Sequence, residues 1–451
     1  MKLHSERKPA TNIQISRIMS RFLAAEKKFS PILLWSVIVG ILTGAAAALF
    51  QISIEKVQVL REVLLRTLPQ LPPILLAASV IFSAVLVFLA FLLVRKVAPE
   101  TGGSGVHEIE GALDEVRPIR WKNVLPVKFI GGTLSLGSGM VLGREGPTIH
   151  MGGNIGKMVA DLFKAGKEDT HALIAAGAGG GLTAAFNAPL AGILFVFEEM
   201  RPEFKYNFLS VQSVILASAA SDIALRSIMG QGPEIKMQML APPPLTSLWL
   251  FLIFGLLFGI LGVIFNFVLI RTLDFFSKLK GPAFTFTGLY VGGFIGLVAW
   301  LYPDMAGGGY KVIPDAISGA IPATMLLLLF FARFGTTIIS YGSGAPGGIF
   351  APMLALGTLF GMWYGNVAHG FLPGVDITPE LFAVAGMAAL FCATVRAPLT
   401  GIAITIEMTG NYFLILPLIL TCLTATLVAE GLGGKPVYTL LLKRALSLAR
   451  K

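Results

Sequence analysis

The sequence predicts an all-α protein that crosses a lipid bilayer many times and consists of two repeated halves with interrupted helices. Charged residues make up 13% of the chain, hydrophobic residues make up 55%, and the mean hydropathy is +0.78. A soluble domain carries about 25% charged residues. This deficit, with repeated apolar stretches of about 20 residues, is typical of a polytopic helical membrane protein.

A series of apolar segments are the candidate membrane spans. They cover residues 31–54, 74–95, 123–142, 172–197, 208–229, 246–270, 284–302, 320–340, 349–371, 381–408 and 413–430. Several contain Gly or Pro, and short, interrupted hydrophobic segments are typical of transporters that use half-helices. Glycine is abundant, at 51 residues, which permits close helix packing and irregular backbone beside a cavity.

Basic residues gather at both ends of the chain, so the positive-inside rule places both termini in the cytoplasm. They are Lys2, Arg7, Lys8, Arg17, Arg21, Lys27 and Lys28 at one end, and Lys435, Lys443, Arg444, Arg450 and Lys451 at the other. Nucleic-acid binding is not favoured, because these charges flank membrane spans and no recognisable binding motif accompanies them. We also expect no removable signal peptide, since residues 1–30 lack a short apolar region with a cleavage site.

The polar, proline-rich segment 232–244 is the best candidate for a connection between two halves. The expected parts are a basic cytoplasmic segment, 1–30; a transmembrane domain, 31–440, with halves 31–231 and 245–440; and a short basic cytoplasmic tail, 441–451.

The two cysteines, Cys392 and Cys422, lie in apolar runs, which indicates buried thiols rather than a disulfide or a metal site. The histidines lack metal-ligand spacing. No nucleophile–base motif and no His-Glu-x-x-His motif of an intramembrane hydrolase occurs. We therefore expect no metal, no cofactor and no enzymatic activity.

An internal repeat supports the division into halves. Gly137-Ser138-Gly139 precedes Gly143-Arg144-Glu145-Gly146-Pro147, and Gly342-Ser343-Gly344 precedes Gly348-Ile349-Phe350-Ala351-Pro352 at the same spacing. A second pair follows in the same order: Ala188-Pro189 leads to Glu198, and Ala397-Pro398 leads to Glu407 at the same distance. Duplicated halves bring their motifs together at a central pseudo-symmetric site.

Glu145 is an acid that one half carries and the other lacks, because it aligns with Phe350. An ionisable side chain inside a bilayer is costly, which makes it a functional-site candidate. A structural helix cap is the alternative interpretation. A structural role would more naturally require the acid in both halves.

Four glycine-rich segments share the chemistry of an anion site, namely 101–108, 143–147, 347–352 and 433–438. In the second and third, proline suits the first turn of a helix, and glycine lets a backbone approach an ion closely. Several helix N-termini aimed at one point attract an anion without a full positive charge. A buried Lys or Arg would hold the ion too tightly to release it.

These segments resemble those of the CLC family of chloride channels and transporters, and within it the bacterial ClcA-type proton/chloride exchangers. The resemblance spans residues 31–440 and is carried by Gly103-Ser104-Gly105-Val106-His107-Glu108, Gly143-Arg144-Glu145-Gly146-Pro147, Gly348-Ile349-Phe350-Ala351-Pro352 and Tyr438. It implies the CLC-type fold of two inverted repeats with broken and tilted helices. It also implies a homodimer with a separate pathway in each subunit, in a bacterial inner membrane.

The resemblance implies a role for each matching residue. Chloride would be held by two hydroxyls and two backbone N–H groups, those of Ser104, Tyr438, Ile349 and Phe350. Glu145 would be the external gate, which leaves the anion path when protonated. Glu199 would transfer protons on the internal side, so that chloride and protons are exchanged.

Glu199 is also present in one half only, since it aligns with a methionine in the other. A solvated acid at the end of a span is the alternative interpretation. Its neighbour Glu198 aligns with Glu407. We expect this duplicated pair to be structural, with arginines such as Arg201 or Arg396 as partners.

His107 departs from the family pattern, which usually has proline at this position. Histidine keeps a helix possible after Ser104, and we expect a tolerated substitution. An added titratable group near the inner mouth is the other interpretation. In this family, serine at the position of Ser104 goes with chloride preference, and proline there with nitrate.

A passive voltage- or pH-gated chloride channel on the same fold is the alternative function. Channel members of the family commonly lack an acid at the position of Glu199. We therefore favour a secondary active antiporter.

Overall fold

The computed structural model describes residues 31–200, 204, 206–232, 234–235, 237–375 and 377–449. The predicted N-terminal segment, 1–30, lies outside the described residues, as do the last two residues of the predicted tail. The described part is helical, and its β-structure is limited to two isolated bridges. The all-α prediction is confirmed.

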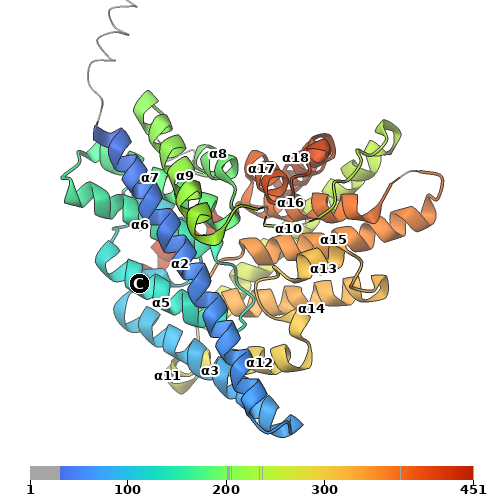
Figure 1. The fold of residues 1–451 in the computed structure, drawn as a ribbon, viewed down its shortest axis with the longest axis horizontal. Helices are drawn as coiled ribbons and strands as arrows, with labels where there is room; N and C mark the ends of the chain where they lie inside the picture. The colour runs from blue at the N-terminus through green and yellow to red at the C-terminus, as the bar shows by residue number, and fades with distance from the viewer. Residues whose placement is uncertain are drawn as a thin grey trace, which may run out of the picture.

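The helices follow one another with short connections (Figure 1). They are α2 (Pro31–Thr67), α3 (Pro72–Val97), η1 (Pro99–Thr101), α4 (Val106–Leu113), α5 (Trp121–Gly137), α6 (Glu145–Leu162), α7 (Lys167–Phe186), α8 (Pro189–Glu198), α9 (Phe208–Met229), η2 (Leu245–Ser247), α10 (Leu248–Ser277), α11 (Gly281–Thr285), α12 (Thr287–Leu301), η3 (Pro303–Met305), α13 (Val312–Ile317), α14 (Ala323–Gly342), α15 (Phe350–Phe371), α16 (Pro379–Val395), α17 (Pro398–Thr409), η4 (Tyr412–Leu414), α18 (Ile415–Gly431) and α19 (Val437–Ala449).

Long apolar helices and shorter ones are mixed along the chain. Within the described residues, six helical segments are long and apolar enough to cross a membrane: Pro31–Thr67, Pro72–Val97, Phe208–Met229, Leu245–Ser277, Ala323–Gly342 and Tyr412–Gly431. Helices α8, α12 and α16 are apolar but shorter. The protein is therefore a multi-pass membrane protein in which short helices lie among complete spans.

Two predicted spans, 172–197 and 381–408, are each broken into two helices. Asn187 ends α7 with φ of 54° and Arg396 ends α16 with φ of 75°. A residue in the left-handed region terminates a helix, and in each case a proline two residues later begins the next one. These breaks agree with the expectation of interrupted spans and broken helices, and a proline marks each of them.

Helix α6 (Glu145–Leu162) was not among the predicted spans, because it carries glycine and polar residues along its length. The predicted span 349–371 corresponds to α15 (Phe350–Phe371), its counterpart in the repeat. Both helices are mostly buried in the protein. Burial against other helices therefore replaces contact with lipid, and hydropathy alone does not detect α6.

The two halves repeat their helix packing as well as their motifs. Helix α6 crosses α7 where Gly152 meets Gly177, and α15 crosses α16 where Gly357 meets Gly386. A Cβ atom on Gly152 would lie 2.1 Å from the carbonyl oxygen of Gly177, and one on Gly357 would lie 2.0 Å from that of Gly386. Such backbone contact requires glycine at both crossings.

Helices α8 and α17 lie side by side and cap each other (Figure 1). The carboxylate of Glu198, at the end of α8, accepts hydrogen bonds from the N–H groups of Leu399 (3.0 Å) and Thr400 (2.8 Å) at the start of α17. In return, Glu407 of α17 accepts from the first turn of α8. Each helix end touches the beginning of its partner, so the two helices are antiparallel, as expected for inverted halves.

Among the described residues, the hydrogen-bond partners of the duplicated acids do not include the expected Arg396. Helix N-termini supply the donors, since their first N–H groups lack intrahelical acceptors. The Arg396 guanidinium instead donates to the carbonyl oxygens of Ala393 and Gly434. Arg201, the other expected partner, lies outside the described residues.

Replacing Gly357 by alanine tests the backbone contact between α15 and α16. The new methyl group would collide with the carbonyl of Gly386, and overpacking of this kind costs about 1–3 kcal/mol. We expect a lower thermal unfolding temperature in detergent, measured by size-exclusion chromatography after heating. Gly370 of the same helix has open space around its Cα, so Gly370→Ala is the control and should not lower that temperature. Equal stability of the two variants would contradict the packing argument.

Candidate functional site

The two copies of the glycine-rich motif meet at the centre of the protein. The N–H of Gly143 donates to the carbonyl of Gly348 at 2.8 Å, and the N–H of Gly348 donates to the carbonyl of Gly143 at 2.7 Å. This reciprocal antiparallel exchange has local two-fold symmetry. It brings the starts of α6 and α15 together.

Helices α6 and α15 begin at equivalent residues of the repeat, Glu145 and Phe350. The prolines, Pro147 and Pro352, are therefore the third helical residues rather than the first. At that position the missing proline N–H is one that a helix would leave unpaired anyway. The remaining N–H groups of each first turn add to the positive end of the helix dipole and attract negative charge.

The loop that carries Ser104 is attached to the same centre. Gly103 donates to the carbonyl of Ala345 and accepts from the N–H of Gly347, both at 3.1 Å. Gly103 and Gly105 have φ of 63° and 84°, a region that glycine adopts without strain. A Cβ on Gly146 of α6 would lie 2.6 Å from the Ser104 Cβ. Glycine thus permits the closest approach between this loop and the start of α6.

Lys128 binds the backbone of the loop that carries Ser104. Its ammonium is fully buried on α5 and donates to the carbonyls of Thr101 (2.9 Å) and Gly103 (2.6 Å). Carbonyl oxygens satisfy this buried charge in place of a carboxylate. Lys128 is therefore bound to the backbone of the loop that carries Ser104, with Gly103 directly before Ser104.

Two buried tyrosines contribute hydroxyls to this region, Tyr341 beside Ser104 and Tyr438 beside Phe350. The Tyr341 hydroxyl lies 3.4 Å from both the N and the Oγ of Ser104. Tyr438, at the start of α19, is fully buried, and its hydroxyl has no hydrogen-bond partner among the described residues. A buried hydroxyl normally has a partner, so this one has a free donor for a bound anion.

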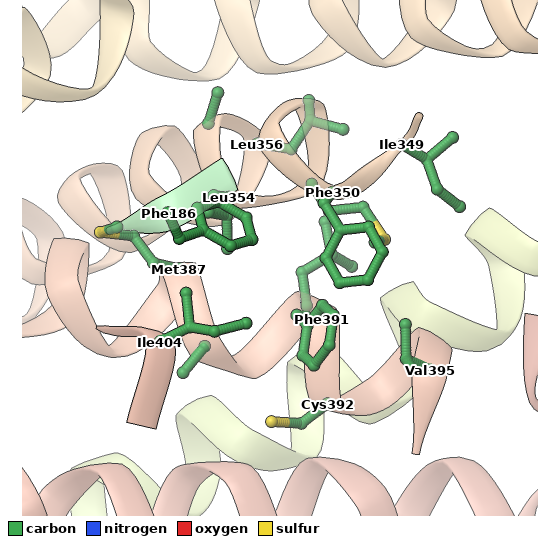
Figure 2. Close-up of a cluster of buried hydrophobic side chains, with 14 of the residues drawn as sticks. Phe186, Ile349, Phe350, Leu354, Leu356, Met387, Phe391, Cys392, Val395 and Ile404 are labelled. Carbon is green, nitrogen blue, oxygen red and sulfur yellow. The ribbon is translucent and has the colours of Figure 1, made fainter. Parts of the chain in front are cut away.

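The side chain of Phe350 faces away from these polar groups into an aromatic cluster. Figure 2 shows its ring directly against Phe391, at a centroid distance of 5.0 Å. The ring of Tyr438 stacks against Phe350 at 6.0 Å. The contact with Phe350 therefore orients the ring of Tyr438. The backbone N–H groups of Ile349 and Phe350 remain at the start of α15.

Glu145 is fully buried and its carboxylate lies over the first turn of α15, in the other half. The N–H of Ala351 lies 3.3 Å from Oε2, and the hydroxyl of Tyr310 donates to Oε1. A Cβ on Gly143 would overlap the carboxylate, at 2.0 Å from Oε2. The carboxylate therefore occupies a place where the donors of α15 could otherwise bind an anion.

Glu199 lies apart from this centre, at the C-terminal end of α8. Its backbone N–H continues the helix to the carbonyl of Phe195 at 2.9 Å, and its side chain is partly exposed. The neighbouring Glu198 is bound to the start of α17, so the two adjacent acids differ in their surroundings.

His107 lies in the first turn of α4, which begins at Val106 as expected after Ser104. Its Nε2 lies 3.7 Å from the carboxylate of Glu108. Glu108 in turn accepts two hydrogen bonds from Arg117, at 2.7 and 2.9 Å. The histidine is accommodated without loss of the helix.

Two cavities are bordered by residues next to the site. The cavity beside the Ser104 loop, here called the Ser104-side cavity, has about 480 Å³ and is bordered by Gly103, His107, Tyr341 and Arg444. The Glu145-side cavity, of about 230 Å³, is bordered by Leu142, Arg144, Glu234 and Tyr310, the tyrosine that donates to Glu145.

The structure thus brings Ser104, Tyr438, Glu145 and the first turn of α15 together, and it places Glu199 at a distance. Sequence reasoning missed Lys128, Tyr310 and Tyr341. Lys128 could have been found as a lone cation inside the predicted span 123–142. Tyr341 directly precedes a repeat glycine, but no sequence signal separates either tyrosine from an ordinary membrane aromatic.

Comparison with known proteins agrees with this geometry. A family model described as "Voltage gated chloride channel" matches residues 85–430, most of the chain. The chain belongs to this family, the CLC family. Ser104, Glu145, the first turn of α15 and the broken helices lie within the matched region, and Tyr438 lies just beyond it.

Curated CLC relatives are similar over nearly their whole length. The protein named "H(+)/Cl(-) exchange transporter ClcA" from Vibrio parahaemolyticus serotype O3:K6 is 52% identical over 420 residues, which cover 92% of this chain and 90% of the relative. The protein of the same name from Salmonella arizonae is 47% identical and covers 98% of this chain and 94% of the relative.

Solved structures share the fold. A slow cyanobacterial Cl−/H+ antiporter has 43% sequence identity and a TM-score of 0.91, covering 94% of this chain and all of that chain. A CLC-type fluoride/proton antiporter, at 19% identity, has a TM-score of 0.74 and covers 90% of this chain and 96% of that one. At that identity the likeness shows the fold alone.

Proposed function

We propose that this protein is a secondary active antiporter that exchanges chloride for protons. The observation that carries the proposal is the position of Glu145, whose carboxylate accepts from the first turn of α15. A carboxylate and a chloride ion compete for the same donors, and protonation removes the competition. Movement of protons and chloride is therefore linked at one place. The exchangers among the relatives support the same activity.

Chloride binds between Ser104 and Tyr438 on one side and the backbone N–H groups of Ile349 and Phe350 on the other. The unpaired hydroxyl of Tyr438 and the helix N-terminus of α15 support this assignment. Neutral hydroxyls and amides bind an anion strongly enough to admit it and weakly enough to release it. The ammonium group of Lys128, behind the Ser104 loop, already donates to two carbonyl oxygens.

Glu145 is the gate on its side of the site. While ionised, it fills the place over α15 and closes the path toward the Glu145-side cavity. When protonated, it loses the charge that the helix N-terminus attracts and gives way to chloride. The position of Glu145 in one half makes the two ends of the pathway chemically different.

Glu199 passes protons between the cytoplasm and Glu145. Its partial exposure at the end of α8, which gives it access to water, supports this proposal. The neighbouring Glu198 is committed to capping α17. The two adjacent acids therefore have separate tasks.

In the membrane, we propose a homodimer with one pathway in each subunit, in the inner membrane of a bacterium. The basic ends place both termini, the segment 1–30 and the tail 441–451 in the cytoplasm. Residues 31–440 form the transmembrane domain. The Ser104-side cavity, which the C-terminal helix borders through Leu441 and Arg444, then opens toward the cytoplasm.

A passive chloride channel is the alternative on the same fold. Chloride-driven proton uptake into liposomes that hold the purified protein separates the two functions. An antiporter pumps protons inward against their gradient as chloride leaves, and its reversal potential depends on pH. Chloride flux without proton uptake would instead establish a channel.

Glu145→Ala removes the carboxylate that competes with chloride. We expect chloride flux to continue and chloride-driven proton movement to fall to background, measured by paired chloride and pH electrodes outside liposomes. Persistent proton pumping by this variant would disprove the role of Glu145 as gate.

Glu199→Gln removes a titratable proton carrier and keeps the shape of the side chain. We expect anion transport to continue while the ratio of protons to chloride falls several-fold. The control is Glu198→Gln, which changes the adjacent acid and should keep coupling. A normal ratio in Glu199→Gln would exclude it as the relay.

Ser104→Ala combined with Tyr438→Ala removes both hydroxyls from the proposed chloride site. Hydrogen bonds to a charged group contribute about 1.5–3 kcal/mol, so chloride affinity measured by calorimetry should fall about tenfold or more. Tyr438→Phe, which keeps the ring against Phe350, should give a smaller loss in the same direction. Undiminished affinity in the double variant would place the site elsewhere.

A further inference from the structure

Tyr310 is the one side chain outside the predicted site residues whose hydroxyl donates directly to the Glu145 carboxylate within the described part of the chain. It stands between η3 and α13, in a glycine-rich turn that follows Gly307-Gly308-Gly309. No sequence motif assigned it a role.

The turn before Tyr310 is held rigidly. Arg333 of α14 is fully buried and donates to the carbonyls of Asp304 (2.6 Å), Ala306 (3.0 Å) and Gly307 (2.8 Å). The N–H of Gly307 donates to the carbonyl of Gly139 at 2.8 Å. A buried guanidinium that satisfies three carbonyls fixes the path of a loop. The phenol is therefore presented from a fixed frame.

Close packing sets how far this turn stands from α15. Gly309 has φ of 102°, and a Cβ there would lie 2.5 Å from the Cβ of Ala355 on α15. The turn thus rests on the helix whose N-terminus also binds Glu145. Tyr310 reaches the carboxylate from the side opposite to Ala351.

Arg144 and Glu234 hold the ring of Tyr310. The Arg144 guanidinium lies 4.4 Å from the ring centroid, forms an ion pair with Glu234 and contacts the carbonyl of Ala185 at 3.4 Å. A guanidinium over an aromatic face is attracted by the ring. These groups border the Glu145-side cavity, so the hydroxyl of Tyr310 lies where that cavity meets the gate.

We propose that Tyr310 is a positioning residue of the gate, whose hydroxyl holds the ionised carboxylate of Glu145 over the start of α15. The proposal rests on the proposed function of Glu145. A hydrogen bond donated to a carboxylate favours its ionised form. Tyr310 therefore sets the pH at which the gate is released, and it slows release near neutral pH.

Other charged and titratable groups of the described residues also lie around the gate. Arg144 faces Glu145 from the residue before it, and Glu234 acts through Arg144. From α19, Tyr438 is within electrostatic range, and from α2, Glu55 borders the same cavity. All of these remain when the Tyr310 hydroxyl alone is removed, so a single variant isolates the hydrogen bond.

Tyr310→Phe in liposomes tests the proposal, with chloride flux and proton flux recorded across a range of pH. The ring and its contact with Arg144 are kept. We expect the midpoint of acid activation to move to higher pH by about one unit, chloride turnover at pH 7 to rise several-fold, and the ratio of protons to chloride to stay unchanged. The control is Tyr302→Phe, the same change at an exposed position, which should leave the profile in place.

The double variant Tyr310→Phe/Glu145→Gln separates the hydrogen bond from a structural effect. Compared with Glu145→Gln alone, it should have the same flux and pH dependence, because no carboxylate remains to be held. An unshifted midpoint in Tyr310→Phe, or an equal rise in flux in the glutamine background, would overturn the proposal. Wild-type protein that moves chloride without protons would overturn the antiport function, whereas the midpoint of chloride flux would still test Tyr310.

Discussion

The first turns of two helices, α6 and α15, meet at the centre of the protein, and their positive partial charges require a negative group nearby. The rest of the structure holds these two turns in place. The first turns of α6 and α15 are joined through Gly143 and Gly348, and each adds positive partial charge at the same place. Without a negative group between them, the two ends would repel. Glu145 supplies that group from within the chain, and the proposed function has an anion from solution compete for the same place.

The helix breaks serve this arrangement. A helix that crossed the whole membrane would leave its N-terminus in water, where the dipole is screened. Because α6 and α15 begin inside the protein, their unpaired N–H groups lie where few other hydrogen-bond donors compete for a negative group. The glycine contacts between α6 and α7 and between α15 and α16 hold these half-helices in place, and the reciprocal caps of α8 and α17 join the two halves.

Much of this could be read from the sequence, and the reasons for the exceptions are physical. The repeat predicted that the two motifs meet, because the same spacing of Gly and Pro indicates the same backbone conformation in both halves. The breaks at Asn187 and Arg396 are marked by a single polar residue and a following proline, and hydropathy averaged over a whole span does not detect so short an interruption. The partners of Glu198 could not be predicted either, because they lie at the start of a distant helix, α17. Nothing in the sequence near Glu198 indicates that contact. Tyr310 acts through geometry that only the folded turn creates.

The two-fold backbone exchange at Gly143 and Gly348 bears on the direction of the pathway. Two identical halves around this exchange would carry the same residue at both equivalent positions, and such a pathway could not tell one side of the membrane from the other. In this chain Glu145 stands opposite Phe350, so the two sides differ in their side chains although the backbone is repeated.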